Sequence, residues 1–197
     1  MQPTAVKKLI IAGGGTAGWM AAAAMSKKFG ELLEIIIVES DEIGTVGVGE
    51  ATIPPMRVFH KLLGIDEQEF MRETRATFKL GISFENWGHN GDKYIHSFGK
   101  NGKETWLGDF HHFWLYAQKL GLKEFNYGDF CLELKASLAN KFMTGPNFDI
   151  NYAYHLDASR YAKFLRAMSE KHGARRIEGK VVEVRQDHDS GFITHLV

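Results

Sequence analysis

The chain has 197 residues, enough for one domain of ordinary size or one and a half. Its hydrophobic fraction of 44% is normal for a globular protein with a sizeable core, and 24 basic residues balance 24 acidic ones. Because the net charge is zero, no global positive field exists to attract nucleic acid or an anionic membrane, and we expect neither as a partner. The single cysteine, Cys131, excludes an internal disulfide and suits the reducing cytosol, so a cytoplasmic protein is expected.

The first elements read as a βαβ unit. Residues 7–12 are a short apolar run that ends in glycines, which predicts a buried parallel strand. Residues 16–29 are rich in Ala, Met and Lys and predict a helix, with Gly30 as its C-terminal stop. Residues 34–39 predict a second strand, so strand, helix and strand fall within about 30 residues, the length of one βαβ unit.

The next segments predict a loop at 43–55 and a helix from Met56 to Leu63. A further helix is expected from Asp66 to about Leu80, since Asp66 and Glu69 make a capping-box-like pair at its start.

The aromatic and glycine-rich stretch 82–150 has weak periodicity, and it predicts short strands and loops with one helix near 112–120. Apolar residues at helical spacing predict a helix over 157–172. Residues 179–197 read as two strands around a hairpin loop at 187–191.

The glycines after the first predicted strand carry the first functional signal. The run Gly13-Gly14-Gly15-Thr16-Ala17-Gly18 fits G-x-G-x-x-G between a strand and a helix. In this pattern Gly13 permits the tight turn, Gly15 lets the backbone approach a pyrophosphate, and Gly18 lets helix and strand pack closely. Glu39, at the end of the second strand and about 20 residues further on, can accept the ribose hydroxyls of an adenosine. The unit therefore predicts dinucleotide binding, with the pyrophosphate at the helix N-terminus.

The block Gly47-Val48-Gly49-Glu50-Ala51-Thr52-Ile53-Pro54 distinguishes between NAD and FAD. Its glycines allow backbone close to a flat ring, and Glu50 and Thr52 can hydrogen-bond polar cofactor atoms, although a plain structural loop with Glu50 solvated is the alternative. Together with Trp19-Met20-Ala21-Ala22 after the glycine motif, this block resembles the flavin-dependent tryptophan halogenase family. The resemblance implies that FAD is the cofactor and that Gly49, Glu50 and Ala51 belong to its flavin site.

Lys79, in Thr77-Phe78-Lys79-Leu80-Gly81, is the second mark of that family. The resemblance implies that reduced FAD reacts with oxygen to a hydroperoxide, which halide attacks. Hypohalous acid then travels through a tunnel to the lysine, which holds it beside the aromatic substrate. A partly desolvated lysine has a depressed pKa and serves as both donor and nucleophile. From the residues alone, a cation in the last turn of the predicted helix is the competing interpretation.

The C-terminal part and the middle of the chain contain further candidate binding residues. Val181 matches the place where related flavoproteins make a backbone contact to adenine, with Val182 as the alternative register. Arg160 is either a cofactor contact or a surface arginine. The pair His111-His112 has no cysteine nearby and lies among aromatic residues, so no metal site is assigned.

These observations predict an α/β fold, with an FAD-binding Rossmann-like (GR2-type) parallel sheet and an inserted aromatic-rich α+β region. We expect residues 1–55 to form the first part of the FAD-binding domain, 56–150 the inserted substrate-side region, and 151–197 the return to the FAD-binding domain. Family members are more than twice this length, so the sheet is expected to be incomplete in this chain, which would be a piece of a longer protein or a truncated one.

The resemblance implies FAD-dependent halogenation of tryptophan, indole or a similar aromatic compound, using reduced FAD, oxygen and halide. A separate flavin reductase would supply the reduced FAD, because the chain shows no NAD(P)H site of its own. A homodimer is an open expectation. The alternatives are a flavin-dependent aromatic monooxygenase and a truncated FAD-binding fragment without catalysis.

Overall fold

The computed structural model describes residues 6–44, 49–145, 147–148 and 150–197. Its internal contacts divide the chain into two compact units. The first unit comprises Met1–Glu50, Phe59–Ala76 and Leu156–Val197, and the second comprises Ala51–Val58 and Thr77–His155. The domain boundaries expected at residues 55 and 150 stay a prediction. In the described parts of the chain, no helix is long and apolar enough to cross a membrane.

The first unit contains a three-stranded parallel sheet with the order β1-β2-β8. Its strands are β1 (Lys8–Ala12), β2 (Glu34–Glu39) and β8 (Arg175–Glu178). The central strand β2 carries a buried Ile35-Ile36-Ile37 run, as expected for a strand that is covered by neighbours. The first two strands confirm the predicted βαβ unit, while β8 had no sequence prediction.

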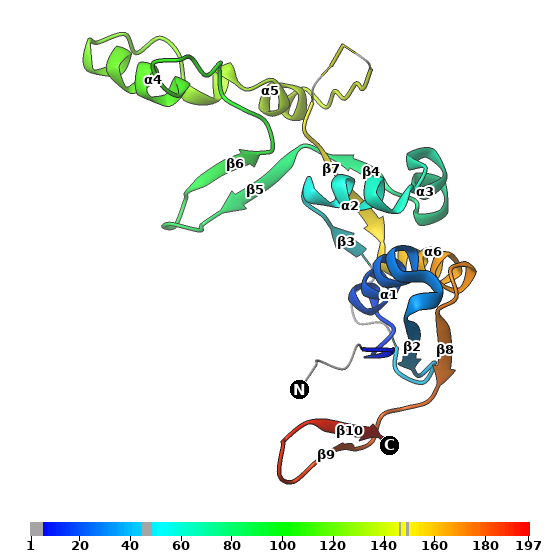
Figure 1. Ribbon diagram of the computed structural model, residues 1–197. Helices are drawn as coiled ribbons and strands as arrows, with labels where there is room; N and C mark the ends of the chain where they lie inside the picture. The colour runs from blue at the N-terminus through cyan, green and yellow to red at the C-terminus, as the bar shows by residue number, and fades with distance from the viewer. Residues whose placement is uncertain (1–5, 45–48, 146, 149) are drawn as a thin grey trace. The chain divides into compact units, whose positions relative to one another are not determined.

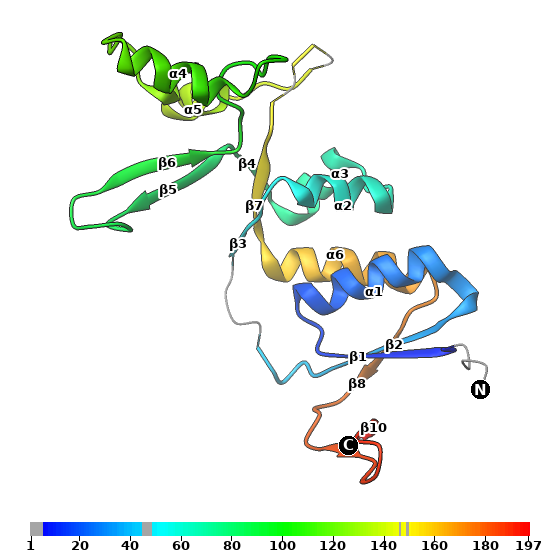
Figure 2. The ribbon, with the colours of Figure 1, turned by 60° about the vertical axis from the view of Figure 1, so that its left-hand side comes forward.

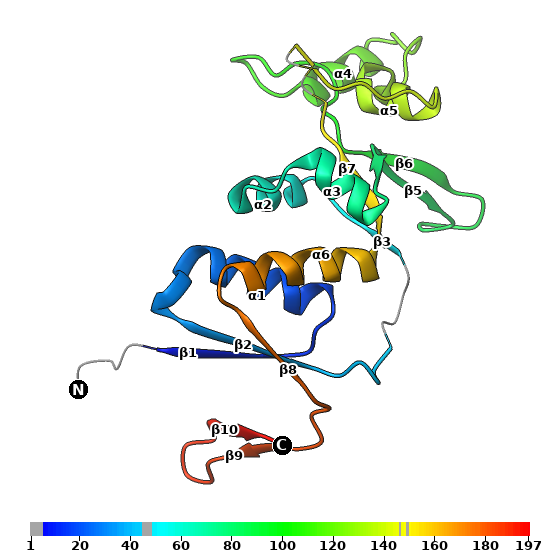
Figure 3. The same ribbon diagram turned by 90° about the vertical axis from the view of Figure 1, so that its right-hand side faces the viewer.

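Helices α1 (Thr16–Phe29) and α6 (Ala158–Lys171) lie side by side over one face of this sheet (Figures 2 and 3). Both match the helices predicted from composition and periodicity. The face that α1 buries is made of small residues after Trp19, namely Ala22, Ala23 and Ser26. Small side chains let the helix approach its neighbours closely, which brings the glycine turn at its N-terminus against the sheet.

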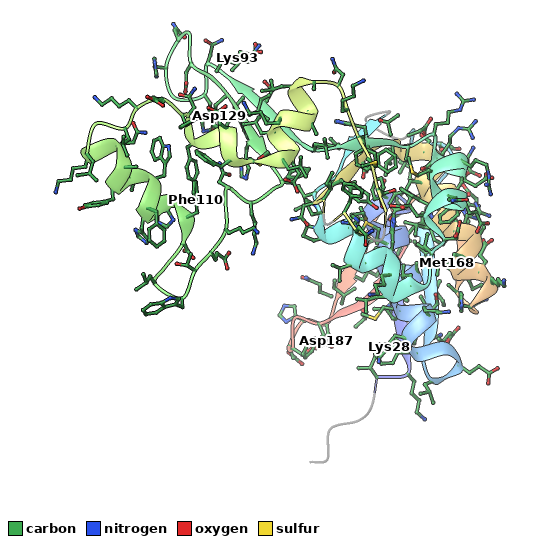
Figure 4. All side chains as sticks on the ribbon, turned by 90° about the horizontal axis from the view of Figure 1, so that it is seen from above. Lys28, Lys93, Phe110, Asp129, Met168 and Asp187 are labelled. Atoms are coloured by element: carbon green, nitrogen blue, oxygen red, sulfur yellow. The ribbon has the colours of Figure 1, made fainter. Side chains whose placement is uncertain are left out.

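Two smaller elements complete the first unit. The short helix η1 (Gly30–Leu32) joins α1 to β2, and the predicted C-terminal hairpin is confirmed as β9 (Val184–Gln186) and β10 (Ile193–Leu196). At the hairpin turn, the Asp187 side chain (Figure 4) accepts a hydrogen bond from the Ser190 amide at 2.8 Å.

Helix α3 (Glu67–Thr74) is shorter than the sequence predicted. Asp66 caps its start as expected, since Oδ1 accepts the Glu69 amide at 2.8 Å. The helix then ends at Thr74 because Arg75 adopts a left-handed conformation, with φ of 53°. The prediction of a helix to Leu80 was wrong, and Lys79 therefore lies on a strand rather than in a last helical turn.

That strand belongs to a second sheet with the order β3-β7-β4. Its members are β3 (Gly49–Ala51), β7 (Ala153–Asp157) and β4 (Thr77–Lys79), and helix α2 (Pro55–Leu63) follows β3. Strands β4 and β7 are antiparallel, with Phe78 opposite Tyr154 and Lys79 opposite Ala153. Backbone pairing with β7 thus replaces the helical hydrogen bonds that the local sequence of 77–79 would have allowed.

The aromatic-rich part of the second unit contains a hairpin and two helices (Figure 1). The elements are β5 (Gly81–Glu85), β6 (Lys93–Ser97), α4 (Phe110–Lys119), η2 (Tyr127–Phe130) and α5 (Leu132–Leu138). The predicted short strands and the helix near 112–120 are confirmed, and α5 is additional. Phe110 of α4 (Figure 4) packs its ring 4.8 Å from that of Phe130, so aromatic side chains build this local core.

Candidate functional site

The glycine turn between β1 and α1 has the geometry of a dinucleotide cradle. Gly13 has φ of 107°, a conformation that favours glycine, and its amide donates to the Val38 carbonyl at 2.8 Å. A Cβ on Gly18 would lie 1.9 Å from the Gly13 carbonyl oxygen, so helix and turn can approach only without a side chain there. A Cβ on Gly15 would meet nothing within 4 Å, which leaves open space at the helix N-terminus.

That open space is part of a cavity of about 670 Å³ in the first unit. The helix N-terminus carries no side-chain cap and no acidic residue in its first turn, so its free N–H groups and dipole suit a phosphate. Residues from β1, α1, β2, β3 and α6 line the cavity, including Gly13, Gly14, Gly15, Thr16, Trp19, Glu39, Gly49, Glu50, Lys163, Arg166 and Val181. The lining thus combines the glycine turn with acidic side chains, such as Glu39 and Glu50, and basic ones, such as Lys163 and Arg166.

The cavity brings together most of the predicted cofactor-binding residues. Those that line it are Gly13, Gly15, Thr16, Glu39, Gly49, Glu50 and Val181. Ala17 and Gly18 lie in the first turn of α1 without lining it, and Ala51 lies at the end of β3. Val181 lies between β8 and β9 and lines this cavity, while Val182 is 73% exposed and is not among its lining residues, so the adenine contact stays a prediction. Gly47 and Val48 lie outside the described residues.

Glu39 is held by side chains that the sequence reading did not connect to it. Arg176 of β8 approaches Oε1 at 2.5 Å, Arg166 of α6 lies 3.7 Å from the same oxygen, and Trp19 donates its indole N–H to Oε2 at 3.2 Å. The hydrogen bond that Arg176 donates to Glu39 raises the pKa of Arg176, with further contributions from neighbouring carboxylates. The side chain at the expected ribose position is therefore oriented by two arginines and a tryptophan.

His60 of α2 and Tyr161 of α6 form a buried pair in the first unit. The His60 Nε2 atom lies 2.8 Å from the Tyr161 hydroxyl, and the Phe70 ring lies 4.4 Å from the imidazole. Burial lowers the pKa of His60 to about 4, which keeps the ring neutral. Burial, and then the charge of Glu50, raise the pKa of Tyr161.

Lys79 lies in the second unit and is only 6% exposed. Its Nζ donates to the Thr52 carbonyl oxygen at 2.9 Å and lies 5.4 Å from the centroid of the Phe98 ring. Burial lowers the pKa of Lys79. Burial and then the charge of Lys79 lower the pKa of His155 on the neighbouring strand β7. A buried lysine with one fixed acceptor can act as a hydrogen-bond donor or, once deprotonated, as a nucleophile.

Neither Arg160, a candidate cofactor contact from the sequence, nor the pair His111-His112 lines the cavity at the glycine turn. Arg160 donates to the Glu73 carbonyl at 3.3 Å and lines a separate cavity of about 680 Å³, away from the glycine turn. The rings of His111 and His112 are tilted by 41° to one another, with centroids 3.8 Å apart. Within the described ranges, no cluster of three or more His, Cys, Asp or Glu side chains could hold a metal ion.

The sequence model of the tryptophan halogenase family matches residues 8–197. Tryptophan 6-halogenase ThaL of Streptomyces albogriseolus is 34% identical over 97% of this chain and 39% of its own length. Tryptophan 7-halogenase RebH of Lentzea aerocolonigenes is 36% identical over 92% of this chain and 38% of its own. The solved structure of Xcc4156, a flavin-dependent halogenase from Xanthomonas campestris, superimposes with a TM-score of 0.90 at 56% identity.

That superposition covers 98% of this chain and 39% of Xcc4156. The chain thus corresponds to the N-terminal part of its relatives and spans about two fifths of their length. Within that part, the family match includes the glycine turn, Glu39, the Glu50 segment and Lys79. The chain belongs to the tryptophan halogenase family.

Proposed function

We propose that this chain forms the FAD-binding and lysine-bearing part of an enzyme that halogenates tryptophan, indole or a similar aromatic compound. The observation that carries the proposal is Lys79, a buried lysine whose Nζ is fixed by one carbonyl at 2.9 Å. Burying a lysine costs free energy, and buried lysines with shifted pKa values cluster at functional sites, which supports a chemical role for Lys79. Membership of the tryptophan halogenase family supports the same assignment.

The cavity at the glycine turn would hold the FAD. Gly13, Gly15, Thr16, Ala17 and Gly18 would receive the pyrophosphate at the start of α1, where the open space and free N–H groups suit it. Glu39 would accept the ribose hydroxyls and the Val181 backbone would contact adenine. Gly49, Glu50 and Ala51 would line the flavin ring. When bound in reduced form, FAD supplies with oxygen the oxidising power that converts halide to hypohalous acid.

Lys79 would hold the hypohalous acid beside the aromatic substrate. Its ammonium has three N–H donors and Thr52 accepts one of them, so with respect to the residues that the structure describes two would serve the oxygen of the acid. A hydrogen bond there makes the halogen more electrophilic, because it stabilises the negative charge that develops on oxygen as the carbon–halogen bond forms.

The proposal includes the partners and the compartment of the complete protein. A flavin reductase would deliver reduced FAD, the substrate would be a small aromatic molecule, and chloride or bromide would be the halide. The protein would work in the cytoplasm.

The decisive experiment replaces Lys79 by alanine in the full-length protein. Halogenation should fall by at least about 100-fold, since a positioned donor contributes that much to a reaction, while FAD affinity stays unchanged. Product is measured by mass spectrometry and FAD binding by flavin fluorescence. The matched control is Lys93→Ala, an exposed lysine of strand β6 that pairs with Glu85 and should leave both quantities unchanged.

Two outcomes would contradict the proposal. Product that forms equally well without halide and carries a hydroxyl group would indicate an aromatic monooxygenase. Halogenation that persists in Lys79→Ala would remove the lysine from the mechanism.

For the 197-residue chain alone, titration with FAD shows whether it binds the cofactor, and failure to bind would favour a fragment without catalysis.

A further inference from the structure

Thr52 is tied to strand β7 by three hydrogen bonds to a single residue. The Thr52 amide donates to the Tyr154 carbonyl at 2.8 Å, and the Thr52 hydroxyl donates to the same oxygen at 3.1 Å. The Tyr154 amide in turn donates to Thr52 Oγ1 at 2.9 Å. Thr52 and Tyr154 are 7% and 2% exposed, so water does not compete for these groups.

The hydroxyl is therefore used as donor and acceptor at once, and its rotamer is fixed by the β7 backbone. The backbone carbonyl of Thr52 accepts a hydrogen bond from the Lys79 ammonium. Strand pairing also connects Tyr154 to Lys79, because Tyr154 lies opposite Phe78, the residue that precedes Lys79. All four residues belong to the second unit.

We propose that Thr52 is a positioning residue for Lys79: its hydroxyl, locked onto the Tyr154 backbone, aims its own carbonyl oxygen at the lysine Nζ. The inference rests on the proposed function, since it gives a catalytic lysine its orientation. The sequence suggested instead that Thr52 contacts the cofactor. In the structure its hydroxyl is bonded on both sides by Tyr154.

The arrangement has a clear consequence for the chemistry of the amine. Burial disfavours the charged lysine, whereas a carbonyl acceptor stabilises it and fixes the direction of one N–H. The N–H donors that Thr52 does not use would then bind the species that Lys79 holds. Phe98 and His155 are the other groups placed near the amine, and the charge of Lys79 acts on His155.

The test compares Thr52→Val, which keeps the shape and removes the hydroxyl, with Thr52→Ser, which keeps the hydroxyl. Reactivity of Lys79 toward a trace acylating reagent is followed by peptide mass spectrometry across a pH series, in full-length protein without flavin or halide. With the carbonyl no longer held on the amine, Thr52→Val should lower the labelling midpoint of Lys79 by about one pH unit. Thr52→Ser should restore it. Thr77→Val, at an exposed threonine of the same strand as Lys79, should leave it unchanged.

In the halogenation assay, Thr52→Val should reduce kcat about tenfold with little change in KM, because a tenfold loss corresponds to one such hydrogen bond. A midpoint that does not move in Thr52→Val would overturn the inference, as would a Thr52→Ser protein that behaves like Thr52→Val, or an equal shift in Thr77→Val. The labelling needs no turnover, so failure of the halogenase proposal would appear separately, as absent halogenated product in the unaltered protein.

If Thr52→Val does not fold, hydrogen exchange in the unaltered protein still tests the inference. The Tyr154 amide should then show slow hydrogen exchange, as a donor buried against the Thr52 hydroxyl does. Exchange at the rate of an exposed amide would overturn the inference.

Discussion

The Glu39 carboxylate accepts from Arg176 and Trp19, with Arg166 close by, while it faces the cavity at the glycine turn. A carboxylate has about four lone-pair sites, so two ribose hydroxyls can still bind to it. The arginines also reduce the cost of burying its charge once a cofactor covers it. Their contribution is preorganisation, because the acceptor already has its bound orientation before the ligand arrives.

His60 makes the stability of the first unit depend on pH. Its folded pKa of about 4 lies below the ordinary value of 6.5, and so below pH 6.5 the unfolded chain binds more protons than the folded one. The stabilisation is complete above pH 6.5 and disappears as pH falls toward 4. We predict a loss of about 2 kcal/mol between pH 7 and pH 5, measured by urea unfolding at each pH.

Replacing the imidazole isolates this effect. His60→Gln should remove that part of the pH dependence, although it also costs stability at pH 7 through lost packing against Phe70 and Tyr161. His188→Gln, at an exposed histidine of the C-terminal hairpin loop, serves as the matched control and should retain the full dependence. An unchanged pH slope in His60→Gln would mean that another group carries it.

At the scale of elements, helix α3 shows where local sequence rules hold and where they fail. The N-terminus follows them, because a capping side chain acts within three residues of its partner. The C-terminus does not, since residues after Arg75 leave the helix to pair with β7, more than seventy positions away in the chain. Amphipathic periodicity cannot report a strand partner at that distance.

We predict that Asp66→Ala destabilises the protein by about 1 kcal/mol, because the Glu69 amide loses its acceptor. Asp66→Asn should be nearly neutral, as asparagine caps equally well. Denaturant unfolding of both variants measures the difference, and equal stabilities of the alanine and asparagine variants would show that the cap does not contribute.

For the whole molecule, the cofactor cavity and Lys79 lie in different compact units. Changes in the first unit should therefore act on FAD affinity and changes around Lys79 on turnover. We predict that Gly18→Ala weakens FAD binding by more than about tenfold, since a Cβ there would lie 1.9 Å from the Gly13 carbonyl and force the turn apart. Lys79→Ala should bind FAD as the unaltered protein does, and flavin fluorescence titration compares the two.

The control for that comparison is Gly145→Ala in the second unit, where, among the described residues, the new Cβ would meet the Phe148 ring at the ordinary contact distance of 3.4 Å. It should change FAD affinity little. If Gly18→Ala binds FAD with unchanged affinity while circular dichroism shows a native fold, the glycine turn would not be the pyrophosphate site.

The sequence by itself determined the βαβ unit, the glycine turn and the family, and it singled out Lys79 as a candidate residue. These features depend on neighbouring residues and on spacings within one supersecondary unit. Only the tertiary structure decided that Lys79 lies on a strand, that Thr52 holds it, and that Arg176 holds Glu39. Each of these depends on partners that the chain brings together from distant positions. Sheet pairing and buried hydrogen bonds select such partners by geometry and desolvation, and neither leaves a periodic signal in the sequence.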